Sequence, residues 1–210
     1  MMILLVLLAF TSFDATDAFL TNKNIRISHS RRYAVESPTQ LEPNVAQLKK
    51  VLRREYISFF NPMDVVFQDP LTELSGIDAY QNNVDMLSGR TWLGKILFSD
   101  ASINLHSVEG GKVTLNGDKV GVSNIVTRWT LRFCFQALPW KPTARFSGIS
   151  VYQVEAAGSE GIRIKQQNDY WDSINLQSDS SYVAADKSVG LKDFLDQLKP
   201  SDLEAPGAAP

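Results

Sequence analysis

The sequence has few of the residues that metal, thiol and histidine chemistry need. Its 210 residues include one cysteine and two histidines. The single cysteine, Cys134, excludes a disulfide within the chain, and its apolar neighbours favour a buried structural thiol over a reactive one. His106 is the only histidine after residue 35. Neither a nucleophile–histidine pair nor a metal site is therefore predicted.

The chain also lacks an excess of basic residues. It contains 21 Lys and Arg against 23 Asp and Glu, for a formal net charge of −2. Nucleic-acid binding depends on neutralising phosphates, so it is not predicted. No glycine-rich phosphate loop is present, and no cofactor is predicted. The apolar run Met1–Phe10 is too short to span a bilayer at ~1.5 Å per residue, so the mature chain is predicted to have no transmembrane segment.

The first 35 residues have the composition of a targeting sequence. Residues 1–18 contain the apolar run and then the small-residue site at Ala18, as in a signal peptide. Residues 19–35 are basic, hydroxylated and free of acidic residues, as in a transit peptide. This arrangement, joined at Ala18-Phe19, resembles the two-part address of secondary plastids such as those of diatoms. A plastid location is expected, and secretion is the alternative.

Apolar periodicity predicts helices first and strands afterwards. Helical spacing covers residues 43–60, 76–88 and 189–198, with a short helical or irregular piece at 92–98. Alternation of period two predicts strands at 64–68, 102–108, 112–116, 119–122, 125–135, 145–155 and 162–171. The order indicates an α+β domain over 43–176, in which N-terminal helices cover a curved antiparallel sheet and leave a cavity inside a cone. A C-terminal amphipathic helix at 186–199 and a disordered tail at 200–210 are expected to follow.

Several short motifs follow one another in a recognisable order. They are DVVFQDP (64–70), Leu74, Gly76 and Tyr80, TRWTLRF (127–133), LPW (138–140), FSG (146–148) and DYWD (169–172). The set resembles an uncharacterised family of plastids and cyanobacteria within the nuclear transport factor 2-like (NTF2-like) superfamily, which also holds SnoaL-like polyketide-cyclase proteins. The resemblance implies the cone fold. It leaves function open between binding or assembly modules and isomerases, cyclases or dehydratases.

One position departs from the family pattern. Related sequences often have a histidine in the last strand where this chain has Gln167. Glutamine can form hydrogen bonds but cannot shuttle a proton near neutral pH. A catalytic histidine would therefore be lost here, whereas a structural one could be replaced.

Asp69 is the candidate catalytic residue. Inside the cone of catalytic relatives, a carboxylate acts as general base because apolar walls raise its pKa. The alternative is that Asp69, preceding Pro70 at a strand end, accepts backbone hydrogen bonds and shapes a turn. Asp169 and Asp172 should face opposite sides of a regular strand, so they make a poor catalytic pair. Asp169 is expected to bond a neighbouring arginine or tryptophan indole.

Aromatic residues are expected to belong to both core and pocket, since the core of a cone contains its pocket. The predicted pocket residues are Tyr80, Trp129, Phe133, Tyr152, Gln167, Asp169, Tyr170 and Trp171. The first hypothesis is a non-catalytic plastid module that binds an apolar small molecule or a plastid protein. The second is a cofactor-free isomerase or cyclase with Asp69 as base and Tyr80 or Tyr170 as donor. Trp140 is expected at an exposed edge, and the sequence leaves a homodimer open.

Overall fold

The computed structural model describes residues 38–51, 65–116, 119–156 and 161–200. The helices are α2 (Pro38–Val51), α3 (Ile77–Leu87), α4 (Trp92–Leu97), α5 (Asp172–Asn175) and α6 (Lys187–Gln197). The strands are β1 (Val66–Gln68), β2 (Glu73–Ser75), β3 (Phe98–Gly110), β4 (Val113–Asn116), β5 (Lys119–Val122), β6 (Ile125–Phe135), β7 (Thr143–Ala156) and β8 (Ile162–Trp171).

Six strands form one sheet in the order β2-β1-β8-β7-β6-β3, and β4 and β5 form a separate hairpin. The long strands β3, β6, β7 and β8 pair antiparallel. The short strand β1 runs parallel to β8, so the sheet is mixed and not wholly antiparallel as predicted. Parallel neighbours need a long connection, and here it comprises the whole chain from β2 to β7.

Alternation along β6 separates the two faces of the sheet. Its inward residues Ile125, Trp129, Phe133 and Phe135 are buried, as is Thr127. Two apolar cores lie on this inner side. One joins α4 and α6 to the β3, β6 and β7 end of the sheet, through Leu97, Phe98, Phe133, Phe146, Trp171, Phe194 and Leu198. The other joins α2 and α3 to β1, β8 and the opposite ends of β6 and β7, through Val45, Leu48, Phe67, Tyr80, Ile125, Tyr152 and Ile164.

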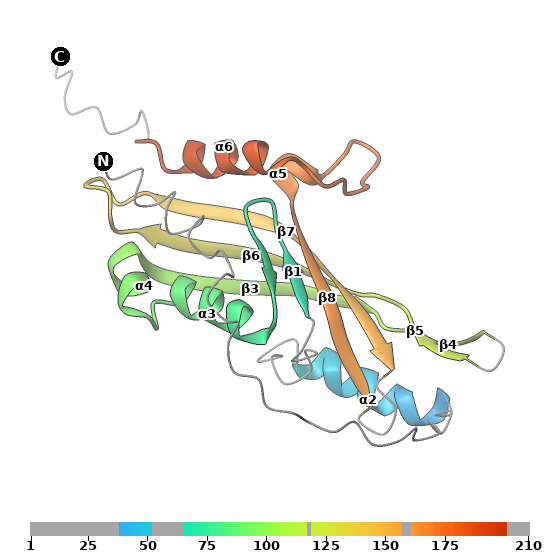
Figure 1. Ribbon diagram of the computed structural model, residues 1–210. Helices are drawn as coiled ribbons and strands as arrows, with labels where there is room; N and C mark the ends of the chain where they lie inside the picture. The colour runs from blue at the N-terminus through green and yellow to red at the C-terminus, as the bar shows by residue number, and fades with distance from the viewer. Residues whose placement is uncertain (1–37, 52–64, 117–118, 157–160, 201–210) are drawn as a thin grey trace, which may run out of the picture.

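The predicted α+β class is confirmed, with a curved sheet and helices packed against it (Figure 1). The cover does not come from N-terminal helices alone, because Phe194 and Leu198 of the C-terminal α6 region complete the first core. The helix predicted at 43–60 begins at Pro38, and its predicted residues after 51 lie outside the described ranges. The short elements β2 and α5 are additions to the prediction.

Cys134 is not the buried thiol that its apolar neighbours predicted. It alternates with Phe133 and Phe135, so its side chain lies on the outer face and is half-buried. The thiol donates to the carbonyl oxygen of Lys141 at 3.4 Å. The apolar residues on either side of Cys134 are buried because they point to the inner face, whereas Cys134 points to the outer face.

Candidate functional site

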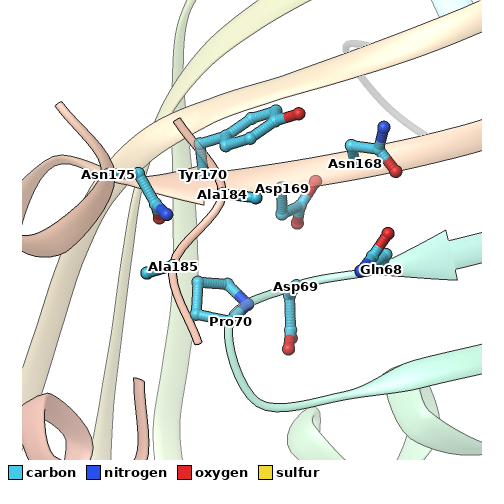
Figure 2. A pocket seen from close by; sticks show the side chains of 9 residues that line it. All are labelled: Gln68, Asp69, Pro70, Asn168, Asp169, Tyr170, Asn175, Ala184 and Ala185. Carbon is cyan, nitrogen blue, oxygen red and sulfur yellow. The ribbon is translucent and has the colours of Figure 1, made fainter. Parts of the chain in front are cut away.

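The parallel pairing of β1 with β8 brings together two carboxyl groups that are far apart in the sequence. Gln68 pairs with Asn168. Asp69 and Asp169 are the next residues of these two segments, so they lie beside each other just after this pair. The preceding pair, Phe67 and Gln167, is buried on the inner side. Asp169 continues β8, so the period of two places its side chain toward that side as well. Asp69 follows the end of β1, and Figure 2 shows its carboxyl directed toward the turn, away from Asp169. Both are half-buried.

Asp69 shapes the turn between β1 and β2. Its Oδ1 accepts the backbone N–H of Leu71 at 2.7 Å and that of Thr72 at 2.6 Å. Its own N–H donates to the carbonyl oxygen of Thr72 at 2.9 Å. The structural role weighed for an aspartate before proline is therefore present, and one carboxylate oxygen is held by the backbone.

Asp169 belongs to a network of buried polar side chains. Gln167 Nε2 donates to Asp169 Oδ1 at 2.9 Å, and Tyr80 Oη donates to Gln167 Oε1 at 3.2 Å. From the other side, Ser150 forms a hydrogen bond with Asp169, and the Trp129 indole donates to Ser150 Oγ at 2.8 Å. The expected direct bond to an arginine or indole is therefore wrong, because the indole reaches Asp169 through Ser150.

A cavity of about 40 Å³ lies between the end of β1 and β8. Figure 2 shows the side chains around it, which are those of Gln68, Asp69, Pro70, Asn168, Asp169, Tyr170, Asn175, Ala184 and Ala185. Most of these residues are polar. A space of this size holds one or a few waters or a single small polar group.

The segment between α5 and α6 lines the cavity with Ala184 and Ala185. Asn175 fastens this segment to the end of β8. Its Oδ1 accepts the N–H of Trp171 at 2.7 Å, and its Nδ2 donates to the carbonyl oxygen of Val183 at 2.8 Å. Gly190 of α6 lies against Pro70, where a Cβ would come within 2.3 Å of the Pro70 carbonyl oxygen. Glycine at this position therefore allows α6 to approach the cavity closely.

The two carboxyl groups have raised pKa values. Burial raises the pKa of Asp69 from 3.8 to about 6, although the N–H groups of Leu71 and Thr72 act to lower it. Burial raises the pKa of Asp169 to about 7, against the hydrogen bonds from Ser150 and Gln167. The neighbouring Asp69 carboxyl adds to the rise at Asp169, because two like charges oppose each other. Near neutral pH, Asp169 therefore keeps its proton more readily than Asp69.

Asp172 lies on the opposite face, as the alternation predicted. Arg128 donates to both of its oxygens, through Nη1 at 2.7 Å and Nη2 at 2.5 Å. Tyr182 Oη donates to Asp172 Oδ1 at 2.7 Å and accepts from Arg128 Nη1 at 2.7 Å. Although partial burial acts to raise the pKa of Asp172, the bonds from Arg128 and Tyr182 lower it below 3.8.

The predicted pocket residues are divided between the cavity and the cores. Tyr80, Trp129, Phe133, Tyr152 and Trp171 are at most 7% exposed and pack in the two apolar cores. Gln167 is buried and forms hydrogen bonds on both sides, which is the role that the sequence left open to it. Asp169 and Tyr170 line the cavity (Figure 2). The Tyr170 ring also lies beside that of Tyr182, with the ring centroids 6.0 Å apart.

Within the described residues, no three His, Cys, Asp or Glu side chains come together as a metal site would need. His106 Nε2 lies 2.9 Å from Thr130 Oγ1 on the outer face, away from the cavity. None of the described helices has the length and apolar character needed to cross a membrane.

The chain belongs to the family described as "Uncharacterized conserved protein (DUF2358)", whose match spans residues 46–162, more than half of the sequence. This confirms the predicted membership of an uncharacterised family. No curated protein matches the chain.

Solved structures similar to the chain include NTF2-like proteins. An NTF2-like protein of unknown function from Cytophaga hutchinsonii is 12% identical, with a TM-score of 0.39, and the alignment covers 62% of this chain and 98% of that one. Nuclear transport factor 2 from Cryptosporidium parvum is 9% identical, with a TM-score of 0.37 and coverages of 63% and 92%. The beta subunit of benzoate 1,2-dioxygenase from Burkholderia mallei is 16% identical, with a TM-score of 0.37 and coverages of 67% and 91%. At these values the likeness says nothing of activity.

Proposed function

We propose that this protein is a non-catalytic ligand-binding module of plastids, and that the cavity between β1 and β8 receives one polar group of its ligand. The observation that carries the proposal is the pair of half-buried carboxyl groups, Asp69 and Asp169, at one small cavity. Pockets that enclose a whole drug-sized ligand measure roughly 300–1,000 Å³. A cavity of about 40 Å³ accommodates only an amine or hydroxyl group. The sequence also predicts that the rest of the ligand is apolar, and this stays a prediction.

The charge of the two carboxyl groups favours a ligand whose hydrogen-bond donor is positively charged. With pKa values of about 6 for Asp69 and about 7 for Asp169, both become ionised as the pH rises from 5 to 8. An ammonium group would compensate for the buried negative charge and add hydrogen bonds. Affinity for a primary amine should therefore increase over this pH range, and a neutral hydroxyl should show a weaker dependence.

Two features favour binding over catalysis. Asp69 Oδ1, the group predicted as general base, is already held by the N–H groups of Leu71 and Thr72. Gln167 orients Asp169 but cannot carry a proton away from it. Asp69 therefore has one oxygen occupied by two backbone N–H groups, and Asp169 has no proton relay through Gln167.

A second candidate function is proton transfer, as in a cofactor-free isomerase or cyclase. One observation favours it, namely that the pKa of Asp169, at about 7, suits a general base near neutral pH. In that case Asp169 takes the place that the sequence assigned to Asp69. Asp69 would then act by raising the pKa of its neighbour.

Native mass spectrometry of the protein recovered from its own plastids tests the binding proposal. We expect a bound compound of defined mass that carries an amine or hydroxyl group, and at least a tenfold weaker retention in Asp169→Ala. Asp172→Ala, an equal truncation on the other face, is the control and should retain the compound. Recovery of an empty wild-type protein, or equal loss in both variants, contradicts the proposal.

The same compound separates binding from catalysis. Incubated with the protein in D2O, a ligand that is only bound acquires no deuterium at carbon. Incorporation that depends on Asp169 and is lost in Asp169→Asn would establish proton transfer instead.

The plastid location rests on the N-terminal sequence and has its own test. A fluorescent protein fused behind residues 1–40 should accumulate in plastids of an alga with secondary plastids. Export of the fusion from the cell would support the secretion alternative, and the cavity proposal would then need a ligand from outside the cell.

A further inference from the structure

Two large apolar side chains project from the short helix α4. Trp92 is 74% exposed and Ile96 is 54% exposed. They are four residues apart, so they lie on the same side of the helix. Leu93 and Leu97 pack instead against the apolar core. The exposed pair thus forms a small apolar tip on a helix that is anchored from its other side.

The turn between β6 and β7 lies at the same end of the sheet. The N–H of Gln136 donates to the carbonyl oxygen of Leu97 at 2.8 Å, and Phe98 pairs with Phe135. Figure 1 shows α4 and this turn together at one end of the long strands. Trp140 in the turn is 42% exposed, as its position in the LPW motif predicted. Its indole N–H donates to the carbonyl oxygen of Leu198 at 2.8 Å, which fixes the ring.

Basic side chains surround this end without acidic partners. Lys95 follows Trp92 on α4, and Lys141 follows Trp140 in the turn; both are exposed. Arg132 and Arg145 lie directly opposite each other on β6 and β7, an arrangement that like charges destabilise. Within the described ranges, none of the four forms an ion pair.

Asp100, in the irregular stretch of β3 beside Arg132, is exposed and forms no ion pair within the described ranges. It is one acidic residue against four basic ones, and two acidic residues on the neighbouring helices are paired with other cations. Asp85 pairs with Arg90 at 3.0 Å. Asp196 pairs with both Lys192 and Lys199. The end defined by Lys95, Arg132, Lys141 and Arg145 is therefore positive in a chain whose formal net charge is −2. Positive charge and the exposed apolar side chains of α4 therefore lie at the same end of the sheet.

We propose that this end of the sheet is a docking surface for an anionic lipid membrane. Trp92 and Ile96 enter the interfacial layer, where tryptophan is favoured because its ring is amphipathic. Lys95 and Lys141 then contact anionic headgroups, with the arginine pair behind them. A bilayer suits this surface better than a folded partner does, because a stable protein interface needs about 800 Å² on each side. Two side chains on a helix of six residues offer much less than this, whereas a basic, amphipathic tip suffices for reversible membrane binding.

Quenching of Trp92 fluorescence by bromine-labelled lipids tests the proposal on the full chain. The vesicles contain phosphatidylcholine with about 30% phosphatidylglycerol, which gives them an anionic surface. We expect the wild type to be quenched and Trp92→Phe to lose most of the quenching. Trp129 and Trp171 are at most 7% exposed and should contribute little, whereas Trp140, 42% exposed at the same end, should account for the quenching that remains in Trp92→Phe. The readout reports where Trp92 lies, so membrane association through the N-terminal apolar run alone does not reproduce it.

Charge variants test the anionic preference. Each basic residue near an anionic surface raises affinity about fivefold, so Lys95→Gln/Lys141→Gln should weaken association about 30-fold. The matched control, Lys112→Gln/Lys165→Gln, removes two exposed lysines at the opposite end of the sheet and should change association less than twofold. Equal quenching in wild type and Trp92→Phe, equal quenching by neutral vesicles, or equal effects of the two double variants overturns the proposal.

Discussion

Asp169 and Asp172 are three residues apart, yet their pKa values move in opposite directions. Asp169 lies on the inner side with two neutral hydrogen-bond donors and a second carboxyl group as neighbours, and its pKa rises to about 7. Asp172 lies on the outer side against Arg128 and Tyr182, and its pKa falls. The DYWD motif therefore contains two different environments. A carboxyl group without a cation in a small cavity is held at a cost in stability, whereas one paired with arginine supports the fold.

Asp169→Asn should have the largest effect on stability and should stabilise the protein. Because the pKa of Asp169 is higher when folded, the wild type loses stability as the pH rises from about 4 to about 7. Asparagine keeps the shape without the charge. We expect a gain of about 3 kcal/mol at pH 8 and almost none at pH 4, from ~1.4 kcal/mol per pKa unit with an allowance for partial exposure. Urea unfolding at the two pH values measures it, and a loss of stability at pH 8 contradicts the account.

Gln167→Leu should destabilise the protein by about 2 kcal/mol at pH 8, because it removes the amide that donates to the Asp169 carboxylate. The loss should be smaller at pH 5, where Asp169 is protonated. The control is Gln166→Leu, which removes a bond from Gln166 to the neutral Asn168 on the other side of the strand. Thermal unfolding of both variants should show a pH-dependent difference only for Gln167→Leu. A pH-independent loss would mean that the amide acts only through packing and its hydrogen bond with Tyr80.

Asp172→Asn should destabilise the protein, opposite in sign to the same substitution at Asp169. The lowered pKa of Asp172 means that its pairing stabilises the fold above pH 3.8 and that this contribution is lost as the pH falls below the folded pKa. Because Arg128 is 38% exposed, the expected loss at pH 7 is only about 1 kcal/mol. Chemical unfolding at pH 7 and pH 2.5 tests this. Stabilisation at pH 7 would remove the distinction between the two aspartates.

Arg132→Glu should have the smallest effect. It replaces the repulsion between Arg132 and Arg145 with an exposed cross-strand ion pair on the same outer face as Arg128 and Asp172. We expect a gain of about 0.5 kcal/mol that decreases in high salt. A thermal melt at low and high ionic strength measures it. A destabilising result would show that the two arginines have partners other than each other.

The strands could be predicted where alternation is long. β6 and β8 have the predicted bounds, 125–135 and 162–171, because eleven and ten residues of alternation leave little ambiguity. β2 and α5 have only three and four residues and contain too little pattern to detect. The alternation also placed Asp169 and Asp172 on opposite faces.

The site itself was only half predictable. Asp69 and Asp169 were each identified as candidates, but their proximity depends on the parallel pairing of β1 with β8, which joins residues 100 apart. No local pattern specifies which distant strand a three-residue segment will join. The partner of Asp169 was assigned wrongly for a related reason. The position of Ser150 beside it follows from the register of β7, which the sequence does not show.

A carboxyl-carbon NMR titration of the wild-type protein from pH 3 to pH 9 tests the central claim most directly. The account predicts that Asp69 titrates at about 6 and Asp169 at about 7, while Asp172 in the same sample titrates below 3.8. Asp69 and Asp169 titrating together with exposed aspartates, near ~3.9, would contradict it. The cavity between β1 and β8 would then be an ordinary hydrated turn and not a binding site.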